Sequence, residues 1–400
     1  MVNADQFKEL YNEQLKNQGN PVFDFSAWDA NTNWQDEIFQ NGFVTNNNIS
    51  ITGASEKNNF YMGVGYSSEQ GNIKHEKFSK ITLSLGSDYK VTKHLKFGFQ
   101  FNGARTLPTD AKEVLGALRT TPVAPVFNEE YGLFCVLPSF QKAQMNNPMI
   151  DVDLKANTTR AENYRGSGNI YGELNFLKNF TFKAMFSLDY GSNSSRTYTP
   201  IVKVYNAEVE GKVETLGTKK TAISQLKQNE MKVQSDYLLT YVNKFNDHGI
   251  TATAGFTTYY NSFSNLNAAR QQGDGLVIAD NPDKWYISIG DAATATNGSS
   301  QWERTTVSML GRVLYNYKSK YLLNASFRRD GSSAFYYTGN QWQNFYSIGA
   351  GWLISEEPFM QNQKFFDMLK LKGSWGSLGN QNMESAYPCL LYTSPSPRDG

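Results

Sequence analysis

The sequence is poor in cysteine, histidine, charge and long hydrophobic runs, and each shortage excludes a class of protein. Two cysteines, Cys135 and Cys389, among 400 residues are too few for a disulfide scaffold, and three scattered histidines provide no metal-ligand spacing. No window approaches the roughly 18 uncharged apolar residues that a membrane-spanning helix needs. The formal net charge of +1 gives no reason to expect nucleic acid as a partner.

Catalytic motifs are also scarce. Ser139 and Lys142 have the S-x-x-K spacing, but they lie in a proline-rich polar stretch without the companion motifs. Gly166, Gly168 and Gly172 miss the dinucleotide-binding spacing and precede a strand instead of a helix. We therefore expect no enzymatic activity, no cofactor and no metal site.

Aromatic residues, in contrast, are abundant, and they alternate with polar ones. The chain is 14% aromatic, and only 19% of its residues are charged. After Tyr321, for example, Leu323, Ala325 and Phe327 share one face of a strand, while the residues between them are polar. We expect about twelve such strands from residue 48 onward, several close to the 9–11 residues of a tilted membrane strand. Alternation alone is equally typical of a soluble sheet with one buried side.

The connections between these strands favour a membrane barrel. Tight turns, such as those at Lys178-Asn179 and Lys318–Lys320, alternate with long polar segments. The expected long segments are Ala104–Ser167, Ser192–Met231, Ser262–Glu303 and Gly331–Asn344. A transmembrane β-barrel has short periplasmic turns and long extracellular loops, whereas a soluble sandwich mixes loop lengths at both ends. Tyr315, Tyr317 and Tyr321 flank one tight turn, as aromatic residues do at a membrane interface.

Five motifs, in order along nearly the whole chain, resemble one family, the SusC/RagA-like TonB-dependent transporters of the Bacteroidota outer membrane. They are NTNWQDEIFQNGF at Asn31–Phe43, ISITGASEKNNFYMGVGYSSEQGNIK at Ile49–Lys74, LGRVLYNYKSKYLLNASFRRDGSSAF at Leu310–Phe335, GWLISEEPFM at Gly351–Met360 and LKGSWGSLGNQN at Leu371–Asn382. The long polar segments match the family only loosely.

The resemblance implies an all-β fold, part of a 22-stranded transmembrane barrel that holds a plug domain. It also implies import of oligosaccharides or peptides, a SusD-like surface lipoprotein as a lid, and energy delivered through TonB. About twelve of the 22 strands would be present, so an open, curved sheet is expected. The chain would lie in the outer membrane, in contact with its lipid.

The resemblance also suggests three regions and two artificial ends. Residues 1–47 would be an extracellular loop segment with a short helix, and residues 48–388 a partial barrel. Met1 falls where the family has an internal methionine, so the chain is expected to be an internal fragment. Cys389 to Asp399 reads CLLYTSPSPRD. Codons of a transposase-type sequencing-library adapter spell the same string, so 389–400 is expected to be non-native.

Polar residues on the lumen side, such as Gln100, Asn102, Glu173 and Asn175, would meet the plug or the ligand. Five aromatic residues in the loops are candidates for stacking on sugar rings: Trp28, Trp34, Trp285, Tyr286 and Trp302. The alternative is that these rings pack loop against loop. At the level of function, a passive porin, an adhesive barrel and a barrel-borne hydrolase remain alternatives to the importer.

Overall fold

The computed structural model describes residues 2–108, 114–209, 211–360, 362 and 365–379. The expected adapter-derived stretch, residues 389–400, therefore lies outside the described residues, as does Cys389. No helix in the described part of the chain is long and apolar enough to cross a membrane.

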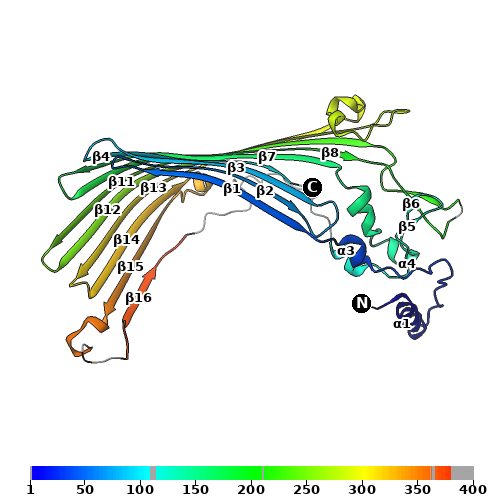
Figure 1. Ribbon diagram of the computed structural model, residues 1–400, viewed down its shortest axis with the longest axis horizontal. Coiled ribbons are helices and arrows are strands. Elements are labelled where there is room, and N and C mark those ends of the chain that lie inside the picture. Colours follow the sequence, from blue (N-terminus) through cyan, green and yellow to red (C-terminus); the bar gives the residue numbers. More distant parts are fainter. Residues whose placement is uncertain (1, 109–113, 210, 361, 363–364, 380–400) are drawn as a thin grey trace, which may run out of the picture.

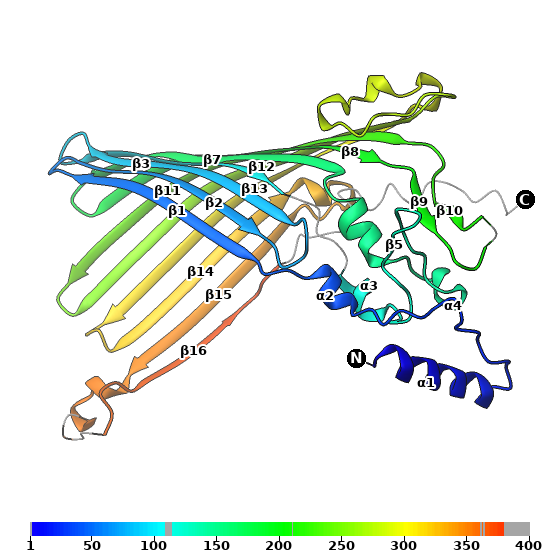
Figure 2. The same cartoon turned by 45° about the vertical axis from the view of Figure 1, so that its right-hand side comes forward.

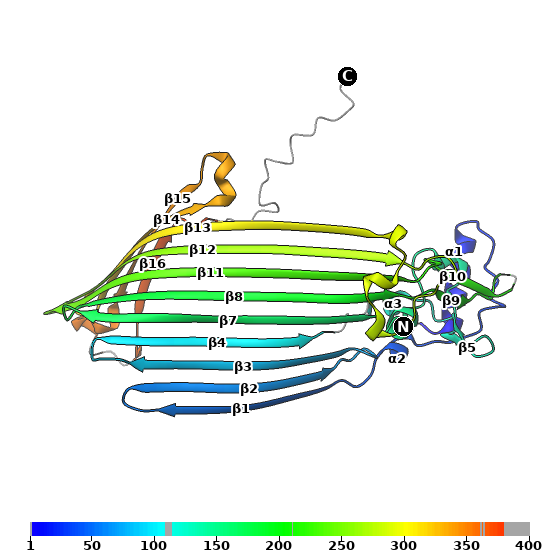
Figure 3. The ribbon, with the colours of Figure 1, turned by 90° about the horizontal axis from the view of Figure 1, so that it is seen from above.

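Twelve antiparallel strands form one open, curved sheet (Figures 1 and 3). The strands are β1 (Phe43–Ala54), β2 (Asn58–Gln70), β3 (Lys77–Lys90), β4 (Leu95–Leu107), β7 (Thr159–Phe176), β8 (Phe180–Thr199), β11 (Ala222–Phe245), β12 (His248–Gln271), β13 (Thr296–Tyr317), β14 (Tyr321–Ser332), β15 (Trp342–Leu353) and β16 (Lys370–Gly376). Each strand pairs with the next one in this order, and the sheet does not close on itself. The expectation of about twelve strands in an open, curved sheet is confirmed.

The tight turns gather at one end of the sheet, which we call the turn end. Several of them use the left-handed backbone region, with positive φ at Leu177 and Lys178, at Asn246, and at Lys318 and Ser319. Such turns reverse a strand within two or three residues and match the strand twist. The turns expected at Lys178-Asn179 and at Lys318–Lys320 are both present.

Strand pairing fixes which residues share a face. Phe186 on β8 lies opposite Ile170 on β7 and Ser235 on β11. Residues directly opposite one another in an antiparallel pair point to the same side. By this rule the apolar residues of neighbouring strands fall on one face, which is the convex side of the curved sheet.

The strands continue far beyond the lengths expected from the sequence, so three of the expected loop boundaries are wrong. The segment Ala104–Ser167 contains the end of β4 and the start of β7. Ser192–Met231 contains the end of β8 and the start of β11, and Ser262–Glu303 contains the end of β12 and the start of β13. These extensions lie outside the apolar zone, and most of their side chains are polar on both faces, with single apolar or aromatic residues such as Leu266 and Trp302 among them. They therefore carry no alternation of apolar and polar residues by which a strand could be recognised.

The remaining connections build a compact group at the opposite end, the loop end. It includes helices α1 (Ala4–Asn17), α2 (Trp34–Ile38), α3 (Val114–Arg119) and α4 (Ser139–Lys142), a π-helical turn at Ile150–Leu154, and the hairpins β5 (Phe127–Asn128) with β6 (Leu133–Phe134) and β9 (Val202–Tyr205) with β10 (Val213–Leu216). We call this group the loop layer. It lies below the concave side of the sheet (Figures 1 and 2).

The first helix begins with a reciprocal cap. The Asn3 side chain accepts a hydrogen bond from the Gln6 backbone N–H (2.9 Å), and the Gln6 side chain accepts one from the Asn3 N–H (3.1 Å). This capping box satisfies two amide groups that the helix cannot pair internally. A short helix was expected in this segment, and α1 confirms it. Strand β1 already begins at Phe43, within the segment 1–47.

Short 3₁₀ turns complete the other connections. They are at Pro282–Lys284, Ile287–Ile289 and Ala292–Thr294 between β12 and β13, at Ser333–Thr338 between β14 and β15, and at Ile354–Glu356 and Pro358–Met360 between β15 and β16. The connection 272–295 lies above the convex side of the sheet, opposite the loop layer (Figures 1 and 2).

Candidate functional site at the concave mouth of the sheet

The loop layer contains the larger of two buried hydrophobic clusters in the described part of the chain. Trp34 and Trp28 are each only 2% exposed within it. The indole N–H of Trp34 donates to the carbonyl of Thr121 (2.8 Å), and that of Trp28 donates to Glu208 (2.9 Å). Both rings therefore pack loop against loop in this structure, which is the alternative weighed for them. Stacking on a ligand stays a prediction that requires the loop layer to open.

Trp285 is also enclosed, but on the other side of the sheet. It is fully buried in the connection 272–295 and stacks on Tyr198 at the loop end of β8, with centroids 5.6 Å apart and an interplanar angle of 12°. The hydroxyl of Tyr198 donates to the carbonyl of Ile278 (3.1 Å). This pair fastens the connection to the convex face. Trp285 thus lies apart from the concave mouth.

The last two candidates lie on different faces. Tyr286 is 53% exposed on the convex side, where the guanidinium of Arg196 lies 4.8 Å from its ring centre. Trp302 is half-buried on the concave side and stacks on Phe263, with centroids 5.9 Å apart. The five candidates therefore do not form one site. Of the five, Trp302 alone belongs to the inner wall of the sheet.

A polar cavity of about 330 Å³ opens beside Phe263 on the concave face. Its side chains come from β3, β4, β7, β8, β11 and β12, and include Lys80, Thr106, Asn163, Arg165, Asp189, Asn193, Gln228, Glu230 and Phe263. Arg165 donates through both Nε (3.1 Å) and Nη2 (3.0 Å) to the same oxygen of Asp189. Amide, charged and aromatic groups in one hollow can hydrogen-bond and stack on a polar ligand.

Farther toward the turn end, the concave face carries a charged cluster. The hydroxyl of Tyr171 donates to Asp88, whose carboxylate also pairs with the ammonium of Lys96 (3.2 Å). The ammonium of Lys183 lies 4.4 Å from the centre of the Tyr171 ring. Neighbouring strands hold these groups in place, because Lys183 and Lys96 both lie opposite Glu173. The inner wall is thus polar at the level where the convex face is apolar.

The residues expected on the lumen side share this concave face. Gln100 lies opposite Asn169, Asn102 opposite Ser167, and Asn175 opposite Thr181, in positions that alternate with the apolar residues of β4 and β7. Their common face is confirmed. Their contact with a plug or a ligand stays a prediction.

Sequence reasoning missed Arg165, Asp189, Gln228 and Phe263, because each lies inside or beside a segment that was expected to be a loop. A signal was present in β7, where Asn163, Arg165, Ser167 and Asn169 keep the two-residue spacing of polar residues. This spacing is a weak strand signal because Glu162 and Tyr164 between them are not aliphatic.

Neither thiol chemistry nor metal binding is indicated by the described residues. Cys135 is buried as a free thiol, and burial raises the pKa of that thiol to about 11, so little nucleophilic thiolate exists near neutral pH. In the part of the chain that the structure describes, no group of three or more His, Cys, Asp and Glu side chains could hold a metal ion.

The convex face presents a continuous zone of exposed apolar side chains, which we call the apolar belt. Phe186 is 44% exposed, Tyr237 45% and Phe327 49%. The belt crosses every strand of the sheet and comprises Ile49, Ile51, Met62, Val64, Leu83, Phe97, Phe99, Phe101, Ile170, Leu174, Phe182, Phe186, Leu188, Tyr237, Leu239, Phe256, Met309, Val313, Leu323, Phe327, Ile348 and Trp375. An exposed apolar surface of this extent is typical of a membrane-facing wall.

The width of the belt agrees with the thickness of a membrane. On β8 it runs from Phe180 at the turn end to Tyr190. Ten residues at ~3.3 Å each and a tilt of ~40° span roughly 25 Å, the height of the apolar band of an outer-membrane barrel. In the opening stretch of β14, Leu323 and Phe327 lie on this face and Asn324 and Arg328 on the other, as expected.

No family model matches the sequence. Among curated proteins, the chain is 28% identical over 370 residues to TonB-dependent receptor P39 of Formosa agariphila, covering 90% of this chain and 33% of that protein. It is 24% identical over 390 residues to TonB-dependent receptor SusC of Bacteroides thetaiotaomicron, covering 90% of this chain and 36% of that protein. The chain thus spans about a third of the length of the curated relatives that it matches.

Among solved structures, the fold is similar to that of the RagAB peptide transporter, with a TM-score of 0.73, 19% identity, and coverage of 96% of this chain and 42% of that chain. A second RagAB structure, in the closed-closed state, gives a TM-score of 0.71 at 19% identity and covers 92% of this chain and 40% of that chain. The chain is therefore similar in sequence to TonB-dependent receptors, SusC among them, and similar in fold to the RagAB transporter.

Proposed function

We propose that the chain forms part of the wall and extracellular mouth of an importer of oligosaccharides or peptides. The observation that carries this proposal is the division between the two faces of the sheet. The convex face is apolar over about one membrane thickness, whereas the concave face carries the Asp88–Lys96–Tyr171 cluster and the cavity beside Phe263. A polar solute can follow such an inner wall through a membrane.

The loop layer lies at the same end of the sheet as this cavity. Its buried tryptophans hold the segments around α2 and α3 in fixed positions below the concave side of the sheet. The relatives suggest the energy source and the partner. They are TonB-dependent, and the solved neighbours assemble as RagAB peptide importers. We therefore propose coupling to TonB and a SusD-like lipoprotein lid for this protein.

Uptake measurements test the proposal. Cells that produce the protein carrying this chain should accumulate fluorescent oligosaccharides or oligopeptides more than cells lacking it, and a protonophore should abolish the difference. Replacing Arg165 by Gln and Phe263 by Ala should lower uptake at limiting ligand. Replacing Lys16 and Lys203, two exposed residues of the loop layer, by Gln should not.

A passive porin is the second candidate, because it also has an apolar outer face and a polar inner one. It predicts a stable conductance in planar bilayers without TonB and uptake that a protonophore leaves unchanged. An adhesive barrel predicts neither uptake nor conductance. The results expected of the porin, or those expected of the adhesive barrel, would contradict the proposal of an importer.

A further inference from the structure

A second cavity, of about 450 Å³, lies on the opposite, convex face, beyond the apolar belt toward the loop end. Side chains of β7, β8, β11 and β12 form its floor, and Tyr286 from the connection 272–295 lies at its side. The concave mouth proposed above does not include it. Its lining residues are Arg160, Glu162, Ser194, Ser195, Arg196, Gln225, Leu226, Lys227, Leu266, Ala268 and Tyr286.

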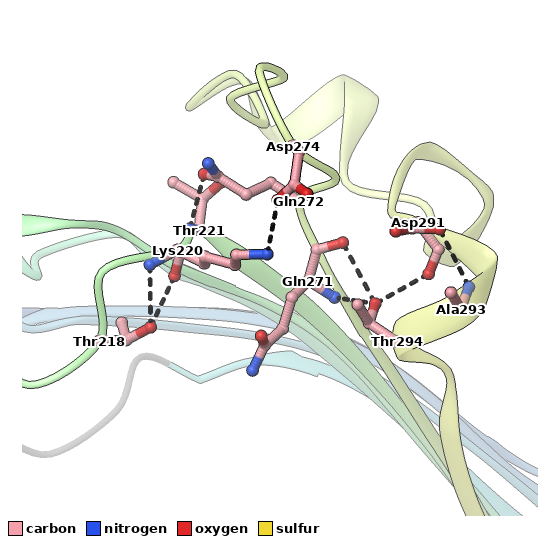
Figure 4. Close-up of polar contacts among 9 residues, drawn as sticks. All are labelled: Thr218, Lys220, Thr221, Gln271, Gln272, Asp274, Asp291, Ala293 and Thr294. Carbon is pink, nitrogen blue, oxygen red and sulfur yellow. Dashed lines mark hydrogen bonds and ion pairs between the residues drawn. The ribbon is translucent and has the colours of Figure 1, made fainter.

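The connection 272–295 is held by polar contacts at both of its ends (Figure 4). At one end, the Gln272 side chain accepts hydrogen bonds from the N–H (2.8 Å) and hydroxyl (2.6 Å) of Thr221. At the other, the Thr294 hydroxyl accepts from the Gln271 N–H (2.9 Å). These contacts, with the stacking of Trp285 on Tyr198, keep the wall of the cavity in place.

Three cations surround the cavity, and two of them have no anionic partner among the described residues. Arg196 lies against the ring of Tyr286, and its buried Nη1 has no hydrogen-bond partner. Lys227 is exposed and forms no ion pair with a described residue. Arg160 pairs with Asp283 at 3.3 Å, but that carboxylate is 87% exposed.

The remaining carboxylate of the lining, Glu162, is already engaged. It accepts hydrogen bonds from the guanidinium of Arg105 (3.1 Å) and from the hydroxyl of Tyr164 (3.0 Å). The lining therefore has an excess of positive charge, and a buried guanidinium nitrogen that lacks an acceptor favours an anion with several oxygen atoms.

The height of the cations above the apolar belt indicates which anion can reach them. Arg196 lies six residues beyond Tyr190 on the same face of β8, and Lys227 lies four residues beyond Met231 on β11. At ~3.3 Å per residue and ~40° tilt, these cations lie roughly 10–15 Å above the edge of the belt. That is the level of lipid head groups, not of acyl chains.

We propose that this cavity binds the phosphate of a lipid head group in the outer leaflet, with the acyl chains of the same lipid against the apolar belt below. The placement relies on the outer-membrane location and on the loop end being extracellular. A lipid fits better than free phosphate because the cavity and the belt share one face of the wall. Arg196 and Arg160 can each bind two phosphate oxygens through a planar guanidinium, and Lys227 adds a compact charge.

The test uses the full chain in detergent micelles and a bis-phosphorylated glycolipid as the probe. Native mass spectrometry measures how much of this lipid the chain retains. Each basic residue at a membrane surface is worth about fivefold in affinity, so the triple variant Arg160→Gln, Arg196→Gln, Lys227→Gln should bind the lipid roughly 100-fold more weakly. The same lipid with its phosphates removed should bind the unaltered chain about as weakly.

A matched control removes three positive charges from the loop layer, which lies on the other side of the sheet: Lys16→Gln, Lys203→Gln, Lys212→Gln. This variant should retain the phosphorylated lipid. A conservative variant, Arg160→Lys with Arg196→Lys, keeps the charge and should lose much less affinity than the triple variant. Circular dichroism of each variant confirms that the sheet is intact.

Three results would overturn the proposal. The first is equal loss of lipid in the matched control, which would indicate a general effect of net charge. The second is equal retention of the phosphorylated and dephosphorylated lipids. The third is competition by inorganic phosphate as strong as that by the lipid, which would assign the cavity to a free anion.

Discussion

Trp34 in the loop layer and Phe186 in the sheet are both large apolar side chains, but Trp34 is 2% exposed and Phe186 is 44% exposed. The loop layer completes its own core, with Ile38, Leu137 and Val204 fully enclosed. The sheet gains most of its order from backbone pairing and leaves its apolar face open. The difference shows that apolar side chains meet different surroundings in the two regions: other protein side chains in the loop layer, and membrane lipid at the belt.

The largest effect is expected from removing a tryptophan of the loop layer, compared with removing one of the sheet. Trp34→Ala should lower the free energy of unfolding of the loop layer by about 3–5 kcal/mol, because a buried ring and its hydrogen bond to Thr121 are lost. Maleimide labelling of Cys135, in a Cys389→Ser background, measures this opening, because the thiol is buried in the same layer.

The matched control is Trp302→Ala. This ring is half-buried on the concave face, so labelling of Cys135 should change by less than a few fold. Equal acceleration of labelling in both variants would show that the loop layer and the sheet open together, and the comparison would fail.

A charge on each face of one strand tests the assignment of lipid to the convex side. Phe186→Arg should lower the free energy of unfolding in lipid vesicles by about 2–4 kcal/mol, because the charge would lie near the middle of the apolar belt. Ser187→Arg, on the concave face of the same strand, should cost much less. Urea titrations followed by tryptophan fluorescence measure both, and a larger cost for Ser187→Arg would reverse the assignment of the faces.

A smaller effect is expected where the connection 272–295 meets the sheet. Tyr198→Phe removes the hydroxyl that donates to the buried carbonyl of Ile278, and should cost about 1–2 kcal/mol. Limited proteolysis within 272–295 should become correspondingly faster. Tyr286→Phe is the control, because the Tyr286 side chain is half exposed, and its cleavage rate should match that of the unaltered chain.

The smallest effect is a pH dependence at the turn end. Hydrogen bonds from the Tyr321 hydroxyl (2.6 Å) and the Trp352 indole (3.1 Å) hold the pKa of Glu357 below its ordinary value of 4.5. The resulting stabilisation is complete above that ordinary value and is lost as the pH falls through the lowered pKa. Hydrogen exchange of segment 354–360 should therefore accelerate in acid.

Glu357→Gln should remove this pH dependence, whereas Glu56→Gln, in another turn at the same end, should leave it intact. If exchange in the Glu357→Gln variant still accelerates in acid, another group is responsible and the role assigned to Glu357 is wrong.

The predictability of the fold differed between the two regions for a physical reason. Within the belt, lipid on one side and water on the other impose alternation, so the strand around Leu323 and Phe327 could be recognised from its sequence. Beyond the belt both faces meet polar surroundings, so the sequence predicts loops where β7, β8, β11, β12 and β13 continue. Arg165, Phe263 and Lys227 were missed as site residues for that reason.

The loop layer was the least predictable part, because its core is assembled from segments distant in sequence. Trp34 donates to Thr121 and Trp28 donates to Glu208, and a local sequence pattern cannot predict contacts between residues so far apart in the chain. The aromatic candidates were consequently identified by residue type alone. The structure buries Trp28 and Trp34 in the loop layer and places Trp302 on the concave face. On the convex side it stacks Trp285 on Tyr198 and leaves Tyr286 beside Arg196.

The amino-acid sequence by itself determined the strand order, the tight turns and the division of each strand into an apolar and a polar face, because local backbone preferences and two-residue spacing are sufficient for these. Only the tertiary structure decided where the strands end, which tryptophans are enclosed, and which cations lie together above the belt. Those outcomes depend on pairing between strands and on contacts between loops far apart in the chain. The energy of such contacts depends on residues from several segments, so no single segment predicts it.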